Sequence, residues 1–357
     1  MTESQSIESA TFERIELPLA DAFTISRGST EITKSVVVRI EDEAGTVGIG
    51  AAAPSSYYDE TIDSVESALP DLLDSAKSVG NPFRLAEIAS RMDATAPEEA
   101  AARAGVSLAL HDLVAKSVGE PLYRRLGLSP ERAPPTSYTV GIDTPGEMAA
   151  RAQRAVQSGH EVLKVKLGTD DDRARISAIR KTAPGARIRV DANGDWTVDE
   201  AIEKADWLAN AGVEFVEQPV AADDIEGLRR VSEEGFLPVA ADESCVTAGD
   251  VPAVADAADI VVVKLMKCGG IRPAISQIET AKAHDCEVML GCMVESNASI
   301  AGAVHLLPLV EYADLDGALL LVEDQFDGVP VRNGRFDLAA VESGTGVRPI
   351  PTDEDRG

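Results

Sequence analysis

The sequence is poor in cysteine and has no long apolar run. Four cysteines in 357 residues show no C-x-x-C spacing, which argues against a zinc site and a disulfide framework. They are Cys245, Cys268, Cys286 and Cys292. The apolar runs, such as 260–263 and 318–322, are far shorter than the roughly 20 residues that span a bilayer. The first ten residues are polar and acidic rather than signal-like, so we expect a cytoplasmic protein.

Basic residues are also scarce. The chain has 33 lysines and arginines against 61 acidic residues, which gives a net charge of -28. Such a charge argues against nucleic acid and anionic membranes as partners. Only ten of the basic residues are lysines, and acidic clusters at 170–172 and 353–355 are typical of solvated surface. This composition is typical of a salt-rich cytoplasm, where salt screens self-repulsion, so we expect a halophilic source.

The first part of the chain, residues 1–132, has the pattern of a small α+β domain. Extended segments run from about residue 7 to 40 and end in the β-branched strand 35–40, after which the pattern becomes helical. Residues 100–116 are rich in Ala and Leu and predict a long buried helix. The sequence Ala133-Pro134-Pro135 marks the end of this domain.

Residues 133–321 follow a different pattern, in which short apolar strands alternate with amphipathic helices. Expected strands lie at 136–140, 162–167, 188–193, 215–219, 239–244, 260–265, 287–291 and 312–316. Eight alternating units predict a closed parallel barrel. A doubly wound sheet would show the same alternation, but no G-x-G-x-x-G follows any strand. We therefore expect a (β/α)7β TIM-like barrel, with residues 322–357 returning to the first domain to complete an α+β cap.

Charged residues end five consecutive strands of the expected barrel. The steps between them from Lys164 onward are 27, 26, 25 and 22 residues, about one βα unit each. A barrel places all strand C-termini on one rim, so these side chains should converge on one pocket. They are Lys164, Lys166, Asp191, Glu217, Asp242 and Lys264.

The three carboxylates of this set, Asp191, Glu217 and Asp242, would repel one another if buried together. A hard divalent cation removes that cost, and three carboxylates with room for water and substrate oxygens suit Mg²⁺. The alternative is that each acid pairs with a lysine across the barrel mouth.

The lysines of the rim are the second chemical signal. Four of the ten lysines in the chain lie at two strand ends that a barrel sets on opposite sides of the acids: Lys164, Lys166, Lys264 and Lys267. A nearby dication and desolvation lower the pKa of a lysine, which lets the amine act as a base. Two such amines facing one carbon could remove a proton on one side and return it on the other, while the metal stabilises an enediolate.

These motifs resemble the enolase superfamily over almost the full chain. LKVKLG looks like its K-x-K strand, VDANGDW, VEQP and ADES look like its three ligand strands, and VVVKLMKCGGI looks like its opposing lysine strand. The resemblance is to the muconate-lactonizing group, because the seventh-strand histidine of the mandelate racemase branch has no match in MLGCM. It implies an isomerase, with Lys166 and Lys264 as the two acid/base catalysts and Lys164 supporting the substrate carboxylate.

The resemblance also implies the cofactor and its surroundings. Asp191, Glu217 and Asp242 would bind one Mg²⁺ per subunit, with Mn²⁺ as a substitute. Asn193 and Glu243 would support these ligands, and the family suggests a symmetric homo-oligomer. Lys267 is the alternative to Lys264 as the second base, because it lies three residues further along.

Within the group, three features resemble the dipeptide epimerases, in particular those acting on L-Ala-D/L-Glu. Asp314-Leu315-Asp316 matches the D-x-D that holds the substrate's α-ammonium, and strand geometry would put both aspartates on one side. MLGCMVES resembles the seventh-strand segment, with Glu295 in its loop. Arg27 falls where the glutamate-specific members place an arginine that meets the side-chain carboxylate. The expected activity is 1,1-proton transfer at the α-carbon of the C-terminal residue of a dipeptide.

Three other functions remain open at this point. A muconate cycloisomerase, o-succinylbenzoate synthase or N-succinylamino acid racemase would share the fold, but a substrate without an α-ammonium leaves the D-x-D unexplained. A Schiff-base lysine aldolase or dehydratase would need no metal, so EDTA would separate it. A catalytically inactive barrel does not account for so complete a set of charged strand ends.

Overall fold

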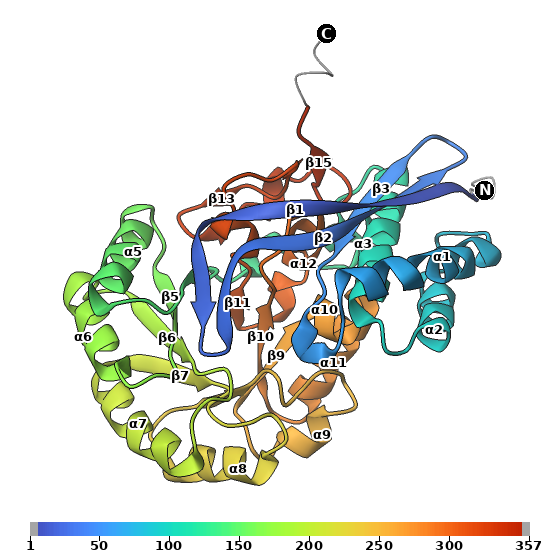
Figure 1. The fold of residues 1–357 in the computed structure, drawn as a ribbon. Helices are drawn as coiled ribbons and strands as arrows, with labels where there is room; N and C mark the ends of the chain where they lie inside the picture. The colour runs from blue at the N-terminus through green and yellow to red at the C-terminus, as the bar shows by residue number, and fades with distance from the viewer. Residues whose placement is uncertain (1–5, 352–357) are drawn as a thin grey trace.

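The computed structural model describes residues 6–351. An antiparallel sheet formed by β1 (Ile7–Ile25), β2 (Gly28–Asp42) and β3 (Val47–Ala52) begins the chain. Its longest feature is the β1–β2 hairpin, which bends so that its tip lies over the barrel (Figure 1). Residues 35–38 of β2 are all buried, because this stretch of the strand is covered by the helices that follow.

Two helices pack against this sheet, α1 (Ile62–Val79) and α3 (Ala100–Ser117), and α2 (Leu85–Thr95) packs against both of them. The predicted helix at 100–116 is confirmed as α3, which is buried along nearly its whole length. It lies so close to β3 that a Cβ at Gly50 would come within 2.4 Å of the Gly105 carbonyl oxygen. This domain also has three shorter helices. η1 (Ser56–Tyr58) precedes α1, whereas α4 (Leu122–Arg125) and η2 (Pro130–Arg132) follow α3 and lead to the barrel.

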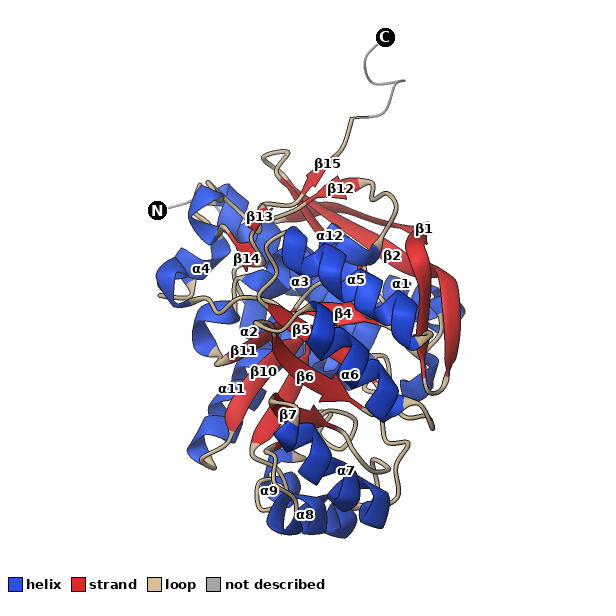
Figure 2. Cartoon of the chain, turned by 90° about the vertical axis from the view of Figure 1, so that its left-hand side faces the viewer, coloured by secondary structure: helices blue, strands red, loops and turns tan. Residues whose placement is uncertain are grey.

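Eight parallel strands in sequential order form the second sheet. They are β4 (Tyr138–Val140), β5 (Val162–Lys166), β6 (Arg187–Asp191), β7 (Val213–Glu217), β8 (Val239–Ala241), β9 (Ile260–Lys264), β10 (Glu287–Gly291) and β11 (Tyr312–Asp314). A parallel bridge between Thr136 and Ala313 joins the two ends of this order. Figure 2 shows the strands inside a layer of helices. The predicted barrel is confirmed.

Helices connect the strands on the outside of the barrel. They are α5 (Pro145–Gln157), α6 (Asp172–Thr182), α7 (Val198–Asn210), α8 (Ile225–Glu234), α9 (Val251–Val254), α10 (Leu265–Cys268), α11 (Ile271–Ala283) and α12 (Asn297–Val304). Local sequence sets their starts: Thr197 caps α7 in a reciprocal capping box with Glu200. The helix between β8 and β9 is short, because α9 has only four residues.

The last described residues run back across the first sheet. After β11, which η3 (Leu307–Leu309) precedes, this segment contains η4 (Gly317–Leu320), β12 (Phe326–Asp327), β13 (Val331–Arg332), β14 (Arg335–Phe336), η5 (Leu338–Ala340) and β15 (Arg348–Pro349). The Val322 amide donates to the Pro18 carbonyl at 2.8 Å, and the Thr345 amide donates to buried Asp112 at 2.8 Å. These bonds tie the hairpin and α3 to the end of the barrel. Among the described helices, none has the length and apolar character needed to cross a bilayer.

Candidate active site

The charged residues predicted at the strand ends lie together on one rim of the barrel. Lys166, Asp191, Glu217 and Lys264 are the last residues of their strands, and Asp242 directly follows β8. All five are buried, with at most 8% exposure. Their convergence follows from the parallel strands, which all end at the same rim.

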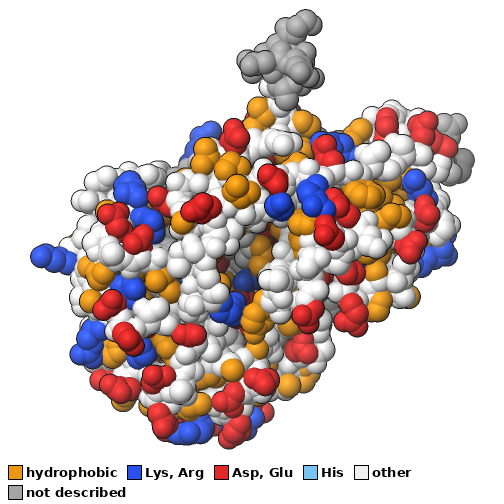
Figure 3. Space-filling view, in the orientation of Figure 1, with side chains coloured by type: hydrophobic (Ala, Val, Ile, Leu, Met, Phe, Trp, Pro, Cys, Tyr) orange, Lys and Arg blue, Asp and Glu red, His pale blue; other side chains and the backbone are white. Residues whose placement is uncertain are grey.

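A pocket of about 230 Å³ opens above this rim. Figure 3 shows a hollow near the centre of this face, with Lys or Arg side chains in and beside it. The walls come from three sources: the barrel strand ends, the β1–β2 hairpin and the loops that carry residues 53–58 and 292–294. The loop after β3 therefore contributes to the cover of the pocket through Ser55, Tyr57 and Tyr58.

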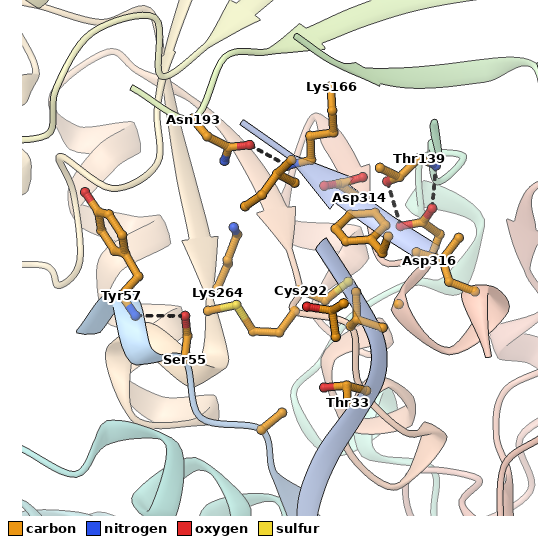
Figure 4. A pocket seen from close by; sticks show the side chains of 18 of the residues that line it. Thr33, Ser55, Tyr57, Thr139, Lys166, Asn193, Lys264, Cys292, Asp314 and Asp316 are labelled. Carbon is orange, nitrogen blue, oxygen red and sulfur yellow. Dashed lines mark hydrogen bonds between the residues drawn. The ribbon is translucent and has the colours of Figure 1, made fainter. Parts of the chain in front are cut away.

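Two lysines reach the pocket from opposite sides of the barrel. Lys166 donates to Asp191 at 2.6 Å and to the Asn193 side-chain oxygen at 3.2 Å. Lys264 donates to Asp242 at 2.7 Å. Their strands, β5 and β9, are separated by three strands in either direction around the barrel. Figure 4 shows both ammonium groups directed into the same space, so a carbon held between them would have one lysine on each face.

Lys164 lies deeper, two residues before Lys166 on the same face of β5. Its ammonium nitrogen lies 2.7 Å from Glu217, 2.7 Å from Asp314 and 3.2 Å from Asp191. These carboxylates raise the pKa of Lys164 well above its usual value, although burial opposes the charge. It therefore remains a cation at the bottom of the pocket.

Lys267 does not reach the pocket. Its ammonium group is fully buried and donates to Asp242 at 2.7 Å, and to the carbonyl oxygens of Asp242, Cys245 and Val262 at 2.6, 3.0 and 2.9 Å. An ammonium with four acceptors and no access to the pocket has a structural role. The geometry thus favours Lys264 over Lys267 as the residue that faces a substrate.

The pKa values of this cluster reflect burial and unequal pairing. Burial, followed by the charge of Asp191, raises the pKa of Glu217 to about 8. Burial also disfavours the charged forms of Asp191 and Asp242, but their lysine partners outweigh it and lower both pKa values. Asp242 in turn raises the pKa of Lys264 above its usual value, although burial acts in the opposite direction. Paired directly with Asp242, Lys264 therefore does not have the lowered pKa that was expected for a lysine beside a dication.

The two aspartates of the D-x-D both line the pocket, but by a different geometry from the one expected. Asp314 ends β11 and contacts Lys164 and the Ser137 hydroxyl. Asp316 lies outside the strand, at the start of η4. The alternation of side chains along a strand therefore does not explain why Asp316 faces the pocket. Its carboxylate accepts from the Thr139 amide at 2.5 Å and the Thr139 hydroxyl at 3.1 Å (Figure 4). Burial and then Asp314 raise its pKa to about 7.

Arg27 reaches the pocket from the tip of the hairpin. Its guanidinium donates to Glu243 at 2.7 Å and to the Asn193 carbonyl at 2.9 Å. The Tyr57 ring lies 4.2 Å from the guanidinium carbon and covers one face of it. The backbone amide of Asn193 donates to Asp191 at 2.8 Å. Asn193 and Glu243 therefore connect the hairpin to the acids at the rim, which is where both were expected to lie.

Glu295 was expected among the substrate-binding residues, but its carboxylate does not line the pocket. Instead it accepts from the Ser299 hydroxyl at 2.6 Å and from the Met293 amide at 3.0 Å. The side chain is bound within the wall beside α12, and burial raises its pKa to about 7. The loop that carries Glu295 contributes Cys292, Met293 and Val294 to the pocket instead.

Several residues of the site were missed by sequence reasoning. Ser137 and Thr139 hold the two aspartates, and their alternation in the TSYTV strand was the available signal. Phe23 and Leu320 line the pocket next to Thr139 and carry no signal in the sequence beyond being apolar.

The donor set fits a hard divalent cation by its chemistry. Asp191, Glu217 and Asp242 offer only oxygen ligands, which Mg²⁺ prefers. Around the rim, six carboxylates and four lysines are buried together: Asp191, Glu217, Asp242, Glu243, Asp314, Asp316, Lys164, Lys166, Lys264 and Lys267. Burial, followed by the charge of Asp191, raises the pKa of Glu217. Each of the three ligand candidates has an oxygen within 2.7 Å of a lysine ammonium. For Asp191 and Asp242 that lysine stands on the adjacent strand, so this pairing differs from the alternative across the barrel mouth. In this arrangement, no three acidic, His or Cys side chains within residues 6–351 stand close enough to one another to hold a metal ion together.

Comparison with known proteins agrees with this geometry. A relative named L-Ala-D/L-Glu epimerase from Bacteroides thetaiotaomicron is 39% identical over 341 residues, which is 95% of this chain and 88% of that protein. The substrate-liganded L-Ala-D/L-Glu epimerase from Bacillus subtilis superposes with a TM-score of 0.91 at 32% identity, over 97% of this chain and 100% of that chain.

A second solved structure is the dipeptide epimerase from Enterococcus faecalis V583 with Mg and the dipeptide L-Leu-L-Tyr. It also superposes with a TM-score of 0.91 at 32% identity, over 96% of this chain and 99% of that one. Residues 8–127 match the mandelate racemase / muconate lactonizing enzyme N-terminal domain, and residues 147–353 match the family described as enolase C-terminal domain-like. The chain therefore belongs to the mandelate racemase / muconate lactonizing enzyme family of the enolase superfamily.

Proposed function

We propose that this protein is an Mg²⁺-dependent dipeptide epimerase, an isomerase that inverts the α-carbon of the C-terminal residue of a dipeptide. The observation that carries the proposal is the pair of buried lysines, Lys166 and Lys264, directed into one pocket from opposite sides of the barrel. The relatives named as dipeptide epimerases support it, since they match over nearly the whole chain.

The chemistry assigned to the lysines is a 1,1-proton transfer. One lysine, as the free amine, takes the α-proton from its face of the substrate, and the electron pair of the C–H bond moves into the carboxylate to form an enediolate. The other lysine, as the ammonium, returns a proton to the opposite face. Lys166 and Lys264 exchange these roles for the two epimers.

The rest of the rim serves to hold and stabilise the reacting carboxylate. Lys164 remains a cation at the bottom of the pocket and offsets the negative charge of the enediolate. Asp191, Glu217 and Asp242 would hold Mg²⁺, which supplies Lewis-acid stabilisation of the same charge. Mn²⁺, another hard cation that accepts oxygen ligands, should substitute.

The opposite end of the pocket recognises the rest of the dipeptide. Asp314 and Asp316 provide the negative charge for the α-ammonium of the N-terminal residue. Arg27 would meet the side chain of the epimerised residue. A glutamate side chain could bind there by replacing Glu243 as the partner of the Arg27 guanidinium.

The activity is tested by incubating a dipeptide library in D₂O with Mg²⁺ and following mass and stereochemistry. We expect inversion with one deuterium entering the α-carbon of the C-terminal residue. No exchange with any dipeptide, together with turnover of a muconate or N-succinyl substrate, would contradict the proposal. Treatment with EDTA should abolish the exchange and added Mg²⁺ should restore it, whereas full activity without metal would favour a Schiff-base lysine mechanism.

We further propose that the protein works in the cytoplasm of a halophilic organism and forms a symmetric homo-oligomer. Acidic side chains are spread widely over the surface in Figure 3, in keeping with the net charge of -28. Salt should screen their repulsion, so the melting temperature should rise when KCl is raised from about 0.1 M to about 2 M. Calorimetry checks this, and a lower melting temperature at high KCl would contradict it. Light scattering reports the oligomeric state.

A further inference from the structure

Two apolar side chains separate the substrate pocket from a second, smaller cavity. Phe23 of β1 and Leu320 of η4 line both spaces, as does Thr139 of β4. The second cavity measures about 30 Å³ and lies beyond them, between the hairpin, β4 and Arg151 of α5. These two side chains therefore form a wall at the end of the pocket that holds Asp316, because Thr139 is the residue that binds the Asp316 carboxylate.

Backbone hydrogen bonds hold in place the two segments that carry Phe23 and Leu320. The Ile142 amide donates to the Thr24 carbonyl at 2.7 Å, which attaches the hairpin to the loop after β4. Gly141 allows this close approach, since a Cβ there would lie 3.2 Å from the Thr24 carbonyl oxygen and 3.7 Å from the Phe23 ring. On the other side, the Val322 amide bonds to Pro18 and holds the residues after η4 against the same hairpin.

The cationic side chains of the pocket and of the second cavity are already paired with carboxylates. Three of the cationic residues that line the pocket, Lys166, Lys264 and Arg27, are bound to the carboxylates of Asp191, Asp242 and Glu243. Behind the wall, Arg151 pairs with Asp143 at 3.0 Å and with Asp21 at 3.4 Å.

We propose that Phe23 and Leu320 determine specificity for the N-terminal residue of the dipeptide, and restrict it to uncharged, mainly apolar side chains. The inference rests on the proposed function, in which Asp314 and Asp316 take the α-ammonium. The side chain of that residue is attached to the same carbon as the ammonium, so it must lie beside Asp316 and against the wall. An acidic side chain would meet the two aspartates, and a basic one would be buried with no carboxylate of its own.

The test is a series of dipeptides with L-Leu at the C-terminus and Gly, Ala, Leu, Phe, Asp or Lys at the N-terminus. Deuterium incorporation in D₂O with Mg²⁺ measures kcat/KM for each. We expect Ala and Leu to lead, and Asp and Lys to be lower by at least about tenfold. Equal rates for charged and apolar N-terminal residues would overturn the inference while leaving the proposed function intact. No exchange with any member of this series or of the wider library would instead contradict the proposed function.

Substitutions of Phe23 and Leu320 test whether these two side chains set the specificity for the N-terminal residue. Phe23→Ala and Leu320→Ala each open the pocket toward the second cavity, so each should raise kcat/KM for N-terminal Phe relative to Ala by about tenfold. The two residues lie on different elements, so either variant tests the wall if the other does not fold. Ile32→Ala is the matched control, because Ile32 lies on the same hairpin, is 52% exposed and does not line the pocket. An unchanged ratio in a folded wall variant, or the same shift in the control, would overturn the assignment.

Discussion

The two ends of the pocket bury carboxylates in opposite ways. At the lysine end, Asp191 and Asp242 each contact lysine ammonium groups within 2.7 Å, and their pKa values are lowered. At the other end, the donors to Asp316 among the described residues are the amide and hydroxyl of Thr139, and the pKa of Asp316 is raised to about 7. Burial disfavours the charged form in all three, so the neighbours decide the outcome. At the lysine end the carboxylates form ion pairs with ammonium groups, whereas no lysine or arginine within residues 6–351 forms an ion pair with Asp316.

Removing either lysine should have the largest effect. Lys166→Ala or Lys264→Ala removes one of the two proton carriers, so epimerisation should fall at least about 10³-fold in each variant. Polarimetry or NMR of the two epimers measures the rate. Lys282→Ala is the control, because Lys282 is 40% exposed and pairs with Glu311 on the surface. Full activity in either single variant would refute the two-base assignment.

Neutralising Asp316 should have the next largest effect. Asp316→Asn keeps the shape of the side chain but removes the unmatched charge, so kcat/KM for a dipeptide should fall about 100-fold. An N-acetylated dipeptide, which has no ammonium, is the comparison. It should be a poor substrate for both proteins, with nearly equal kcat/KM. An equal loss on both substrates would mean that Asp316 acts on structure rather than on the ammonium.

The pH dependence should distinguish the same two ends. Asp316 is neutral below its pKa of about 7 and negative above it, so ammonium binding is lost as the pH falls through that value. The kcat/KM for a dipeptide should therefore drop about tenfold per pH unit on the acid side. In Asp316→Asn this change should be absent. A drop that persists in this variant would assign the titration to another group.

The smallest effect should come from Thr139. Thr139→Val removes the 3.1 Å hydroxyl bond to Asp316 but retains the backbone amide bond. The KM for a dipeptide should rise about three- to tenfold, because one hydrogen bond to the carboxylate is lost. The acid-side change in kcat/KM should also move to higher pH, since that bond stabilises the charged form. An unchanged pH profile would show that the hydroxyl does not tune Asp316.

Much of the barrel could be predicted because its signals are local. A short strand and an amphipathic helix repeat about every 25 residues, and five consecutive strands end in, or are directly followed by, a charged residue that a parallel barrel must place on its rim. The positions of Lys166, Asp191, Glu217 and Lys264 at strand ends depend only on that repeat. Asp316 departs from it because β11 ends at Asp314, where the chain turns into η4.

Contacts between distant segments could not be predicted in this way. Thr139 and Asp316 are 177 residues apart, and Arg27 and Glu243 are 216 apart. Glu295 lies beside the correct strand, yet its carboxylate turns into the wall because Ser299 and the Met293 amide offer hydrogen bonds there. Such choices depend on which donors a side chain meets after folding.

The sequence by itself determined the barrel, the cap and the set of lysines and acids on one rim, because strand period and strand order place residues without reference to their partners. The tertiary structure decided what each charge contacts. It paired Lys267 with four acceptors away from the pocket, bound Arg27 to Glu243, gave Asp316 hydrogen bonds from Thr139 and set Phe23 and Leu320 in the same pocket wall as Thr139. The physical reason is that burial makes the identity of the nearest partner decisive, and those partners come from distant parts of the chain.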